Sequence, residues 1–409
     1  MSGPGQPTPG VPTIADVHAA ARLLEGVAVR TPMETSRWLS DVVGGPVSLK
    51  CENLQRTGSF KARGAYVRVA GLTEAERAGG VVAASAGNHA QGVALAAQRL
   101  GIAATVFMPE GAPIPKEKAT RGYGADVVFS GAHLEDALAA ANAFADETGA
   151  TLIHPFDHPD IVAGQATCGL EILDQVPDVR TVLVPTGGGG LLAGIALAVK
   201  AARPDVRVIG VQASGAAAFP DSLAAGQPRA LEAMATMADG IAVGRPGEIT
   251  FAMVRDLVDE VVTVSEESLS GALLSLVERA KMVVEPAGAA AVAALLDDPS
   301  RFETPAVAVL SGGNIDPLLL GKVIRHGLAA AGRYLYLRVC IKDRPGGLAA
   351  LLADVSETGG NVLEVAHERT SPTLAIDEVE VRIQLETRGV PHAREVAALL
   401  RERGYRIIE

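Results

Sequence analysis

Residues 181–191 read TVLVPTGGGGL, and this stretch decides the fold because it joins a strand, a turn and a helix. Residues 181–184 are β-branched or apolar, as in a buried strand, and a helix is predicted from Leu191 to Ala202. The glycine turn between them leaves free N–H groups at the helix N-terminus, where the helix dipole favours an anion. A flexible turn is the alternative, since glycine adopts almost any backbone conformation. We predict a phosphate site at Gly187, Gly188, Gly189 and Gly190.

This glycine run does not have the pattern of a nucleotide site. No Gly-Lys-Ser or Gly-Lys-Thr follows it, so a P-loop is not indicated. Gly194 gives only a partial match to the dinucleotide pattern, and the acidic residue of that pattern is missing from the right place.

The alternation of strand and helix continues on both sides of this stretch. Further strands are predicted at residues 47–51, 80–84, 104–108, 126–130, 206–212 and 306–310. Further helices are predicted at residues 60–70, 88–100, 134–147, 161–175, 266–281 and 287–297. This succession predicts an α/β fold with doubly wound, mostly parallel sheets.

The pattern changes after about Arg333. Strands are predicted at residues 334–341, 361–369, 375–386 and 405–408, and helices at 348–357 and 391–403. Their order, βαββαβ, is that of a ferredoxin-like α+β domain. The expected parts are a disordered leader (1–12), a main domain (13–321) with a smaller inserted subdomain (about 52–155), a linker (322–333) and the small domain (334–409).

Composition narrows the kind of partner. The 409 residues are 48% hydrophobic and 3% aromatic, with a formal net charge of −11. Such an acidic chain is not expected to bind nucleic acid or an anionic membrane, so a small-molecule ligand is favoured. The cysteines Cys51, Cys168 and Cys340 form no metal spacing or disulfide framework, and each is expected to be buried. Without a recognisable signal peptide, a reducing cytoplasm is the expected location.

Upstream, residues 57–65 read TGSFKARGA and place Lys61 at the start of a predicted helix. The helix dipole and the nearby cation of Arg63 disfavour a charged ammonium, so a partly neutral, nucleophilic amine is expected. A solvated surface lysine is the alternative, since lysine is nearly always exposed. An amine of this kind and a separate phosphate site together suit pyridoxal phosphate, whose aldehyde a lysine binds as a Schiff base.

A second loop, SAGNH at residues 85–89, also lies between a predicted strand and a helix. Its N–H groups suit an amino-acid carboxylate, although Ser85 or Asn88 could be an ordinary helix cap. His89 alone is more typical of a packed helix residue than of an acid or base.

Two polar residues near the end of the main domain are further candidates. Ser311, in the stretch LSGGN, follows a strand and could hydrogen-bond a pyridine nitrogen without protonating it. Glu285 precedes a helix and could cap that helix or face the cofactor.

The motifs GSFKARGA, SAGNHAQG, PTGGGGL, EPAG and SGGN, in this order, resemble those of the fold-type II pyridoxal-phosphate enzymes. The resemblance is closest to the serine/threonine dehydratase (threonine ammonia-lyase) group and runs from about residue 15 to 325. The tail, with DRPGG at residues 343–347, is similar to an ACT domain, which in many enzymes of amino-acid metabolism binds an amino-acid effector. The main domain would then be the catalytic domain.

The resemblance implies a role for each site residue. Lys61 would be the Schiff-base lysine and the α-proton base, and Phe60 would pack beside the cofactor ring. Asn88 would hydrogen-bond the ring 3-hydroxyl, and Ser311 the pyridine nitrogen. The phosphate would be held by Gly187, Gly188, Gly189, Gly190 and Leu191, and the substrate carboxylate by the loop Ser85, Ala86, Gly87 and His89.

The implied reaction converts L-threonine to 2-oxobutanoate and ammonia, and L-serine to pyruvate. Serine racemases have a serine where this chain has Ala86, so elimination is favoured over racemisation. They also place acidic residues for a divalent metal where residues 211–216 read VQASGA here, so no metal site of that kind is expected. The alternatives are a related lyase acting on serine or 3-hydroxyaspartate, a serine racemase, and a non-catalytic amino-acid sensor.

The ACT-like tail implies control by an end-product amino acid, with isoleucine as the natural candidate. The pathway would be isoleucine biosynthesis or threonine catabolism. One such unit per chain implies pairing between chains, so a homodimer or homotetramer is expected. A tail that serves only dimerisation is the alternative.

Overall fold

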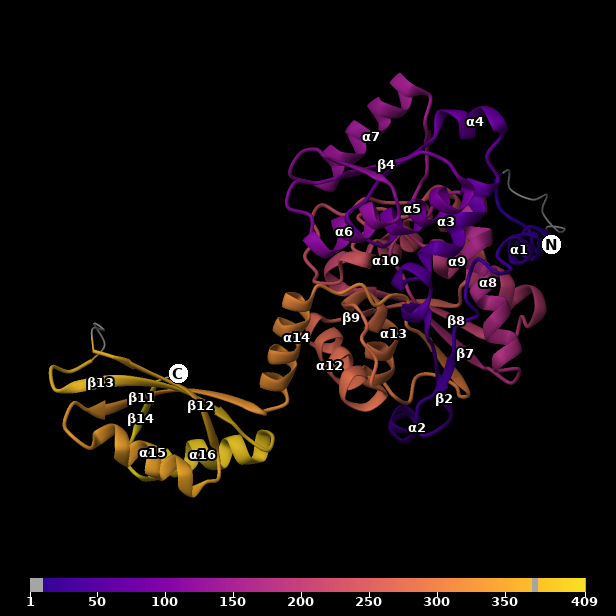
Figure 1. The fold of residues 1–409 in the computed structure, drawn as a ribbon. Helices are drawn as coiled ribbons and strands as arrows, with labels where there is room; N and C mark the ends of the chain where they lie inside the picture. The colour runs from indigo at the N-terminus through magenta and orange to yellow at the C-terminus, as the bar shows by residue number, and fades with distance from the viewer. Residues whose placement is uncertain (1–9, 370–373, 409) are drawn as a thin grey trace. The chain divides into compact units, whose positions relative to one another are not determined.

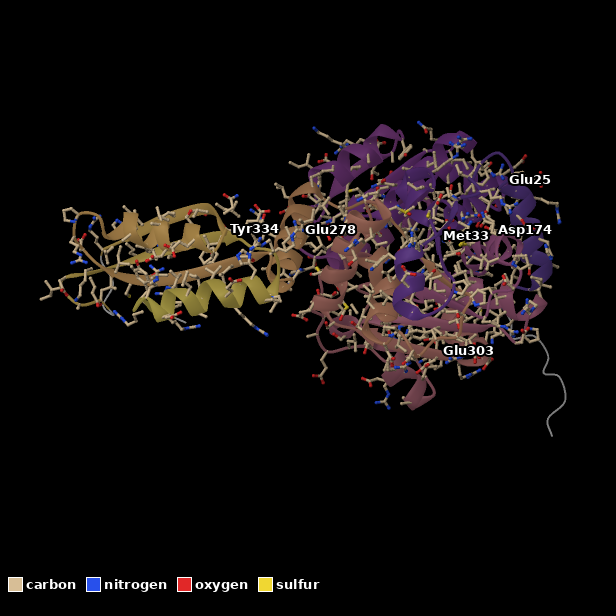
Figure 2. All side chains as sticks on the ribbon, turned by 90° about the horizontal axis from the view of Figure 1, so that it is seen from below. Glu25, Met33, Asp174, Glu278, Glu303 and Tyr334 are labelled. Carbon is tan, nitrogen blue, oxygen red and sulfur yellow. The ribbon has the colours of Figure 1, made fainter. Side chains whose placement is uncertain are left out.

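The computed structural model describes residues 10–369 and 374–408 and divides the chain into two compact units (Figure 1). The first unit ends at Pro317, and the second begins at Leu318. Most of the expected leader, residues 1–9, lies outside the described residues. Charged side chains such as Glu25, Asp174 and Glu303 lie at the surface of the first unit (Figure 2).

The larger part of the first unit is built on a six-stranded sheet in the order β1-β2-β10-β7-β8-β9. Its strands are β1 (Met33–Thr35), β2 (Val47–Lys50), β7 (Thr181–Pro185), β8 (Arg207–Ala213), β9 (Glu260–Val264) and β10 (Ala306–Val309). Neighbouring strands are parallel except for the antiparallel edge pair β1 and β2. The late strand β10 therefore lies between β2 and β7, in the middle of the sheet.

Helices cover both faces of this sheet, whose central strands are buried along their whole length. α9 packs on β7 and β8, with α8 against it, and α13 also packs on these two strands. The helices around this sheet are α1 (Ile14–Leu23), α2 (Arg37–Val43), α8 (Pro159–Gln175), α9 (Gly190–Ala202), α10 (Ala218–Ala225), α11 (Glu248–Leu257), α12 (Glu266–Ser275) and α13 (Pro286–Asp297).

A second, four-stranded parallel sheet has the order β5-β4-β3-β6. Its strands are β3 (Val81–Ala84), β4 (Ala104–Met108), β5 (Asp126–Phe129) and β6 (Thr151–Leu152), and its helices are α3 (Lys61–Ala70), α4 (Glu74–Gly79), α5 (Asn88–Leu100), α6 (Ile114–Gly122) and α7 (Leu134–Thr148). Val81 and Ala83 pack into a core with α3 and α5, whereas Val82 packs with α7. Alternate residues of β3 thus face helices on opposite sides, which makes this sheet doubly wound as well.

All residues of α14 (Pro317–Ala330) except Pro317 belong to the second unit, and the βαββαβ succession follows this helix. The elements of this succession are β11 (Tyr334–Lys342), α15 (Gly347–Glu357), β12 (Asn361–Glu368), β13 (Glu378–Glu386), α16 (Val390–Glu402) and β14 (Arg406–Ile408). The antiparallel sheet has the order β12-β13-β11-β14, and one face of it forms a core with α15 and α16. This is the ferredoxin-like arrangement.

The predicted α/β fold, with doubly wound parallel sheets and a ferredoxin-like tail, is confirmed. Several elements were not predicted, among them β1, β6, β9, α1, α2 and α11. Two segments that were predicted also differ locally. Residues 322–330, expected to be part of a linker, lie in α14. The helix expected at residues 266–281 becomes a π-helical turn at Leu276–Ala280, and Lys281 adopts a left-handed conformation with a φ of 60°. The π-helical turn and Lys281 end this helix before the segment that leads to Glu285.

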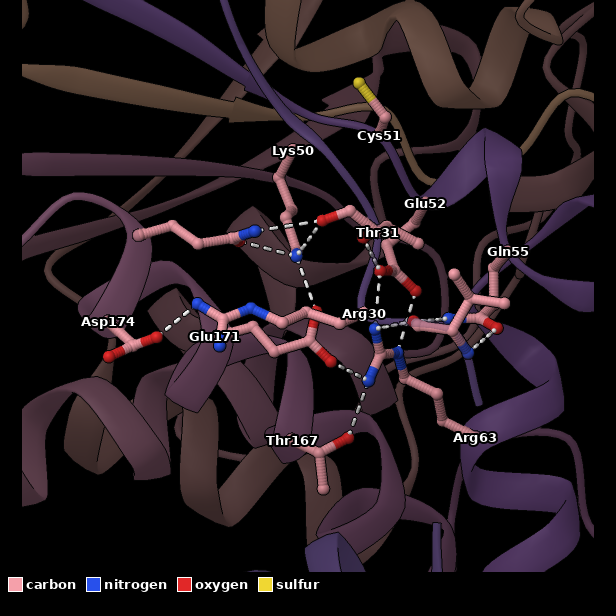
Figure 3. Close-up of polar contacts among 12 residues, drawn as sticks. Arg30, Thr31, Lys50, Cys51, Glu52, Gln55, Arg63, Thr167, Glu171 and Asp174 are labelled. Atoms are coloured by element: carbon pink, nitrogen blue, oxygen red, sulfur yellow. Dashed lines mark hydrogen bonds and ion pairs between the residues drawn. The ribbon is translucent and has the colours of Figure 1, made fainter. Parts of the chain in front are cut away.

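A buried ionic cluster fixes α3 against the large sheet (Figure 3). Arg63 donates to both carboxylate oxygens of Glu52 at 2.8 Å and to Glu171 at 2.7 Å. Lys50, at the end of β2, donates to Glu171 at 2.5 Å. Burial alone would raise the pKa of Glu52, but the Arg63 guanidinium holds it below its usual value. Because buried charges need such partners, the cluster sets the position of α3 relative to β2 and α8.

Candidate active site

Lys61 is the first residue of α3, and Phe60 is its N-cap residue. The Lys61 Nζ donates a hydrogen bond to the Pro155 carbonyl at 2.8 Å and lies 5.3 Å from the centre of the Phe60 ring. Burial lowers the pKa of Lys61 to about 8, and the Glu285 carboxylate opposes this shift. Lys61 is therefore not a solvated surface lysine. Arg63, expected to act on it, is instead bound within the ionic cluster.

The four glycines after β7 form a backbone cradle at the N-terminus of α9, here called the glycine cradle (Gly187–Gly190). Gly189 is the N-cap residue, with a φ of 96°, and supplies no side-chain cap. A Cβ on Gly188 would lie 2.4 Å from the Phe156 ring, and one on Gly189 would lie 2.7 Å from the Phe219 ring. Aromatic rings therefore fill the space where side chains would stand. At the helix N-terminus, the first N–H groups lack intrahelical partners and can receive an anion.

The SAGNH loop connects β3 to α5. Its Gly87 is the N-cap residue, so neither Ser85 nor Asn88 caps the helix with its side chain, and the Ser85 Oγ accepts a hydrogen bond from the Gly87 N–H at 3.1 Å. The His89 Nε2 pairs with the Ile153 carbonyl at 2.7 Å. Burial lowers the pKa of His89 to about 3, so this ring is a neutral, packed group.

Glu285 faces the cavity and does not cap α13. It occupies the N-cap position without a side-chain cap, and its Oε1 accepts a hydrogen bond from the Asn88 Nδ2 at 2.7 Å. The Asn88 Oδ1 in turn accepts from the Asn314 Nδ2 at 2.8 Å. Burial, together with the nearby Asp239 carboxylate, raises the pKa of Glu285 to about 7. Of the two roles considered for Glu285, the structure supports the one that faces the site.

A cavity of about 460 Å³ brings these segments together, a size typical of small-molecule sites. Each site residue predicted from the sequence lines it: Phe60, Lys61, Ser85, Ala86, Gly87, Asn88, His89, Gly187, Gly188, Gly189, Gly190, Leu191, Glu285 and Ser311. Ser311 reaches the cavity from the end of β10. Residues from both sheets therefore meet in one place, although their individual roles stay predictions.

Charged residues that were not predicted from the sequence also line this cavity, among them Lys116, Glu135 and Asp239. Lys116, in α6, forms an ion pair with Asp239 at 2.6 Å, and both side chains line the cavity. Asp239 begins the short 3-10 helix Asp239–Ile241. Neither residue stands in a glycine-rich loop directly after a strand, which was the signal for the glycines, the SAGNH loop and Ser311. The pair spans 123 positions of the chain, so no local pattern reveals it.

The residues present fit pyridoxal phosphate. The glycine cradle suits its phosphate, the amine of Lys61 suits its aldehyde, and the polar groups of Asn88 and Ser311 lie in the same cavity. Among the described residues, no group of three or more His, Cys, Asp and Glu side chains is placed to hold a metal ion. In this same part of the chain, no helix combines the length and the apolar character needed to cross a bilayer.

The chain is similar to known proteins over nearly its whole length. A Thermotoga maritima protein named L-threonine ammonia-lyase is 46% identical over 395 residues, which cover 97% of this chain and 98% of the relative. A Geobacter sulfurreducens protein of the same name is 48% identical over 377 residues, which cover 92% of this chain and 94% of the relative. The solved structure of T.th. threonine deaminase matches with a TM-score of 0.72 and 46% identity, over 75% of this chain and 99% of that one.

A family model described as pyridoxal-phosphate dependent enzyme matches residues 24–312, a span that includes each residue assigned to the cavity. The resemblance predicted from the motifs is therefore confirmed. The chain belongs to the family of pyridoxal-phosphate dependent enzymes, and its cofactor is pyridoxal phosphate.

Proposed function

We propose that this chain is an L-threonine ammonia-lyase, which converts L-threonine to 2-oxobutanoate and ammonia, and L-serine to pyruvate. The observation that carries the proposal is Lys61, a lysine of lowered pKa in the same cavity as the glycine cradle and Glu285. The near-full-length likeness to proteins named L-threonine ammonia-lyase supports threonine as the substrate.

Lys61 has two roles in this proposal. Its Nζ would hold the cofactor by its aldehyde carbon while no substrate is bound, and with a substrate present the freed Lys61 amine would remove the α-proton. A pKa of about 8 suits both roles, because a useful neutral fraction exists near physiological pH. When bound, the cofactor supplies the electron withdrawal that makes the α-proton acidic.

The remaining residues position the cofactor. The glycine cradle and Leu191 hold its phosphate, and Asn88 binds the 3-hydroxyl of its ring. Ser311 would offer a hydroxyl to the ring nitrogen without protonating it, and the ring would then be a weaker electron sink than it would be beside a carboxylate. Such a site favours prompt loss of the β-hydroxyl after the α-proton.

The carboxylate loop favours elimination over racemisation. Ser85, Ala86, Gly87 and His89 line the side of the cavity assigned to the substrate carboxylate. The methyl group of Ala86 has no proton to give, so a one-base site is expected. His89 does not supply the second acid, because it is buried and paired with the Ile153 carbonyl.

Replacing the lysine tests the proposal. The Lys61→Ala variant should lose 2-oxobutanoate formation by about 10³-fold or more, because the base and the covalent anchor are both removed. It should also lose the visible absorption change that L-threonine causes in the wild-type protein. Lys118→Ala, an exposed lysine of α6, is the control and should match wild type. Turnover in Lys61→Ala would overturn the assignment.

We also propose that residues 334–409 form an ACT-like regulatory domain that binds an amino-acid effector, and that residues 13–321, with the subdomain at about 52–155, carry the catalysis. The enzyme would be cytoplasmic and would serve isoleucine biosynthesis or threonine catabolism. The T.th. threonine deaminase supports a separable second unit. The match covers 99% of that chain but only 75% of this one.

Titration with L-isoleucine tests this part. The rate on L-threonine should change with L-isoleucine in the full chain and should not change in a chain that ends at residue 331. An unchanged rate in the full chain would favour a tail that serves only dimerisation.

A further inference from the structure

The ion pair between Lys116 and Asp239 joins the two sheet regions across the cavity. Lys116 lies in α6, which packs on α5 and β5 of the smaller sheet. Asp239 begins a short 3-10 helix that packs on α13 beside the larger sheet. The Lys116 Nζ and the Asp239 Oδ2 are 2.6 Å apart, and both residues line the cavity. The pair therefore borders the space in which a ligand of this cavity would lie.

The two partners differ strongly in burial. The Lys116 side chain is 11% exposed, whereas that of Asp239 is 58% exposed. Water can therefore solvate the Asp239 carboxylate at little cost when the pair opens. The enclosed ammonium, by contrast, needs an anionic partner, because an unpaired charge in such surroundings is costly. An arriving anion can replace Asp239 at Lys116.

The Lys116 ammonium also lies against the SAGNH loop. A Cβ built on Gly87 would stand 3.9 Å from the Lys116 Nζ. Gly87 is the N-cap residue of α5, where the helix dipole favours negative charge. A carboxylate bound at this helix end would therefore meet the ammonium as well as the backbone N–H groups.

We propose that Lys116 exchanges Asp239 for the α-carboxylate of the amino-acid substrate and is thereby a positioning and specificity residue. The proposal rests on the proposed function, since it takes an amino acid as the ligand. The ammonium adds a charge-assisted hydrogen bond that only a free carboxylate can receive. The site should thus select amino acids over their amides, and Asp239 is the partner that Lys116 keeps while the cavity holds no substrate.

Binding of a non-reacting amino acid tests the proposal without relying on turnover. L-alanine lacks the β-hydroxyl and cannot be dehydrated, so its affinity can be titrated through the visible absorption of the holoenzyme, and L-alaninamide serves as the uncharged probe. Lys116→Met should weaken the affinity for L-alanine by about 10- to 100-fold and leave the affinity for L-alaninamide nearly unchanged. The KM for L-threonine should rise by a similar factor. Lys116→Arg should keep most of the selectivity, and Lys118→Met on the same helix should match wild type.

The Asp239→Asn variant separates exchange from a merely structural contact. If Lys116 exchanges partners, removing the competing carboxylate should raise the affinity for L-alanine and lower the KM for L-threonine. If the pair only holds the two regions together, Asp239→Asn and Lys116→Met should weaken both probes alike, and that result would overturn the proposal. An unchanged L-alanine affinity in Lys116→Met would also overturn it. A wild-type protein that selects L-alanine over its amide but makes no 2-oxobutanoate would contradict only the proposed function.

Discussion

Glu285 is a buried carboxylate that holds a proton at a pH where a free one would have lost it. Burial and the Asp239 carboxylate raise its pKa from 4.5 to about 7, although Lys116, Asn88 and Lys61 all favour the charged form. The folded chain therefore binds a proton at Glu285 that the unfolded chain has released. This group makes the folded state less stable as the pH rises from about 4.5 to 7.

The pH dependence of stability tests this property. Relative to a Glu285→Gln variant, the cofactor-free wild-type chain should lose about 3 kcal/mol of unfolding free energy between pH 4.5 and pH 7. Denaturant unfolding at several pH values measures this difference. The exposed Glu303→Gln serves as the control and should follow wild type. Parallel profiles for wild type and Glu285→Gln would contradict a protonated Glu285.

Single residues were predictable where a local pattern carried their chemistry. Lys61 was recognised from the stretch around it, and the glycines from the strand before them and the helix after them. Glu285 was recognised as a candidate, but the choice between a cap and a cavity-facing group needed its contact with Asn88, far away in sequence. Lys116 was not recognised, because its meaning depends on Asp239, which only the folded chain brings near.

At the scale of elements, the buried ionic cluster holds α3, and with it Lys61, against β2 and α8. The Arg63 and Glu52 side chains are 1% and 0% exposed, so each buried charge is stabilised by the opposite charge of the other. An exposed pair nearby, Arg30 with Asp174, provides a natural comparison, since both of its side chains are more than half exposed. Both pairs appear in Figure 3.

Breaking the buried pair should therefore cost far more than breaking the exposed one. Glu52→Gln should destabilise the first unit by about 3–5 kcal/mol, because it leaves the Arg63 guanidinium without its main partner. Arg30→Met should change stability by about 1 kcal/mol or less. Unfolding can be followed by the fluorescence of Trp38, the one tryptophan of the chain. The double variant Glu52→Gln/Arg63→Met should lose less than the sum of its single changes, and strict additivity would argue against coupling.

Most strands and helices of the two sheets followed from periodicity, because strands such as β4 and β7 are apolar runs between turn residues. The π-helical turn at Leu276–Ala280 could not be predicted in this way, because helical periodicity continues through it. The short strand β1 was also missed. It has only three residues and is stabilised by pairing with β2, which no local pattern shows.

At the scale of the whole molecule, the second unit offers an edge for association. β12 stands at one edge of its sheet, and its Val362, Leu363 and Val365 side chains are 37%, 45% and 36% exposed. Apolar side chains on an edge strand favour pairing with another chain. This supports the homodimer or homotetramer that is expected from the sequence.

A charged side chain on this edge strand should weaken the association between chains. Val365→Lys should shift the protein to a smaller species in sedimentation or light scattering, because a lysine on an edge strand opposes pairing. Ile376→Lys, another exposed apolar position of the second unit, should leave the size unchanged. A size unaffected by Val365→Lys would place the contact elsewhere.

The division into two units was visible in the sequence as a change from βα repeats to long alternating strands near Arg333. The helix α14 was not predicted, since residues 322–330 fall within the expected linker (322–333) and its first residues within the expected main domain (13–321). The order of strands in the large sheet was also beyond the sequence, since a βα succession alone does not tell which strands become neighbours.

The position of β10 has a consequence for how the chain is made. β10 (Ala306–Val309) fills the gap between β2 and β7, and Ser311 follows it into the cavity. While the ribosome is still adding residues before this strand, the large sheet lacks its middle and the cofactor lacks one wall of its site. The nascent chain can form the smaller sheet early, but it must wait for almost the whole first unit to emerge before it can capture pyridoxal phosphate.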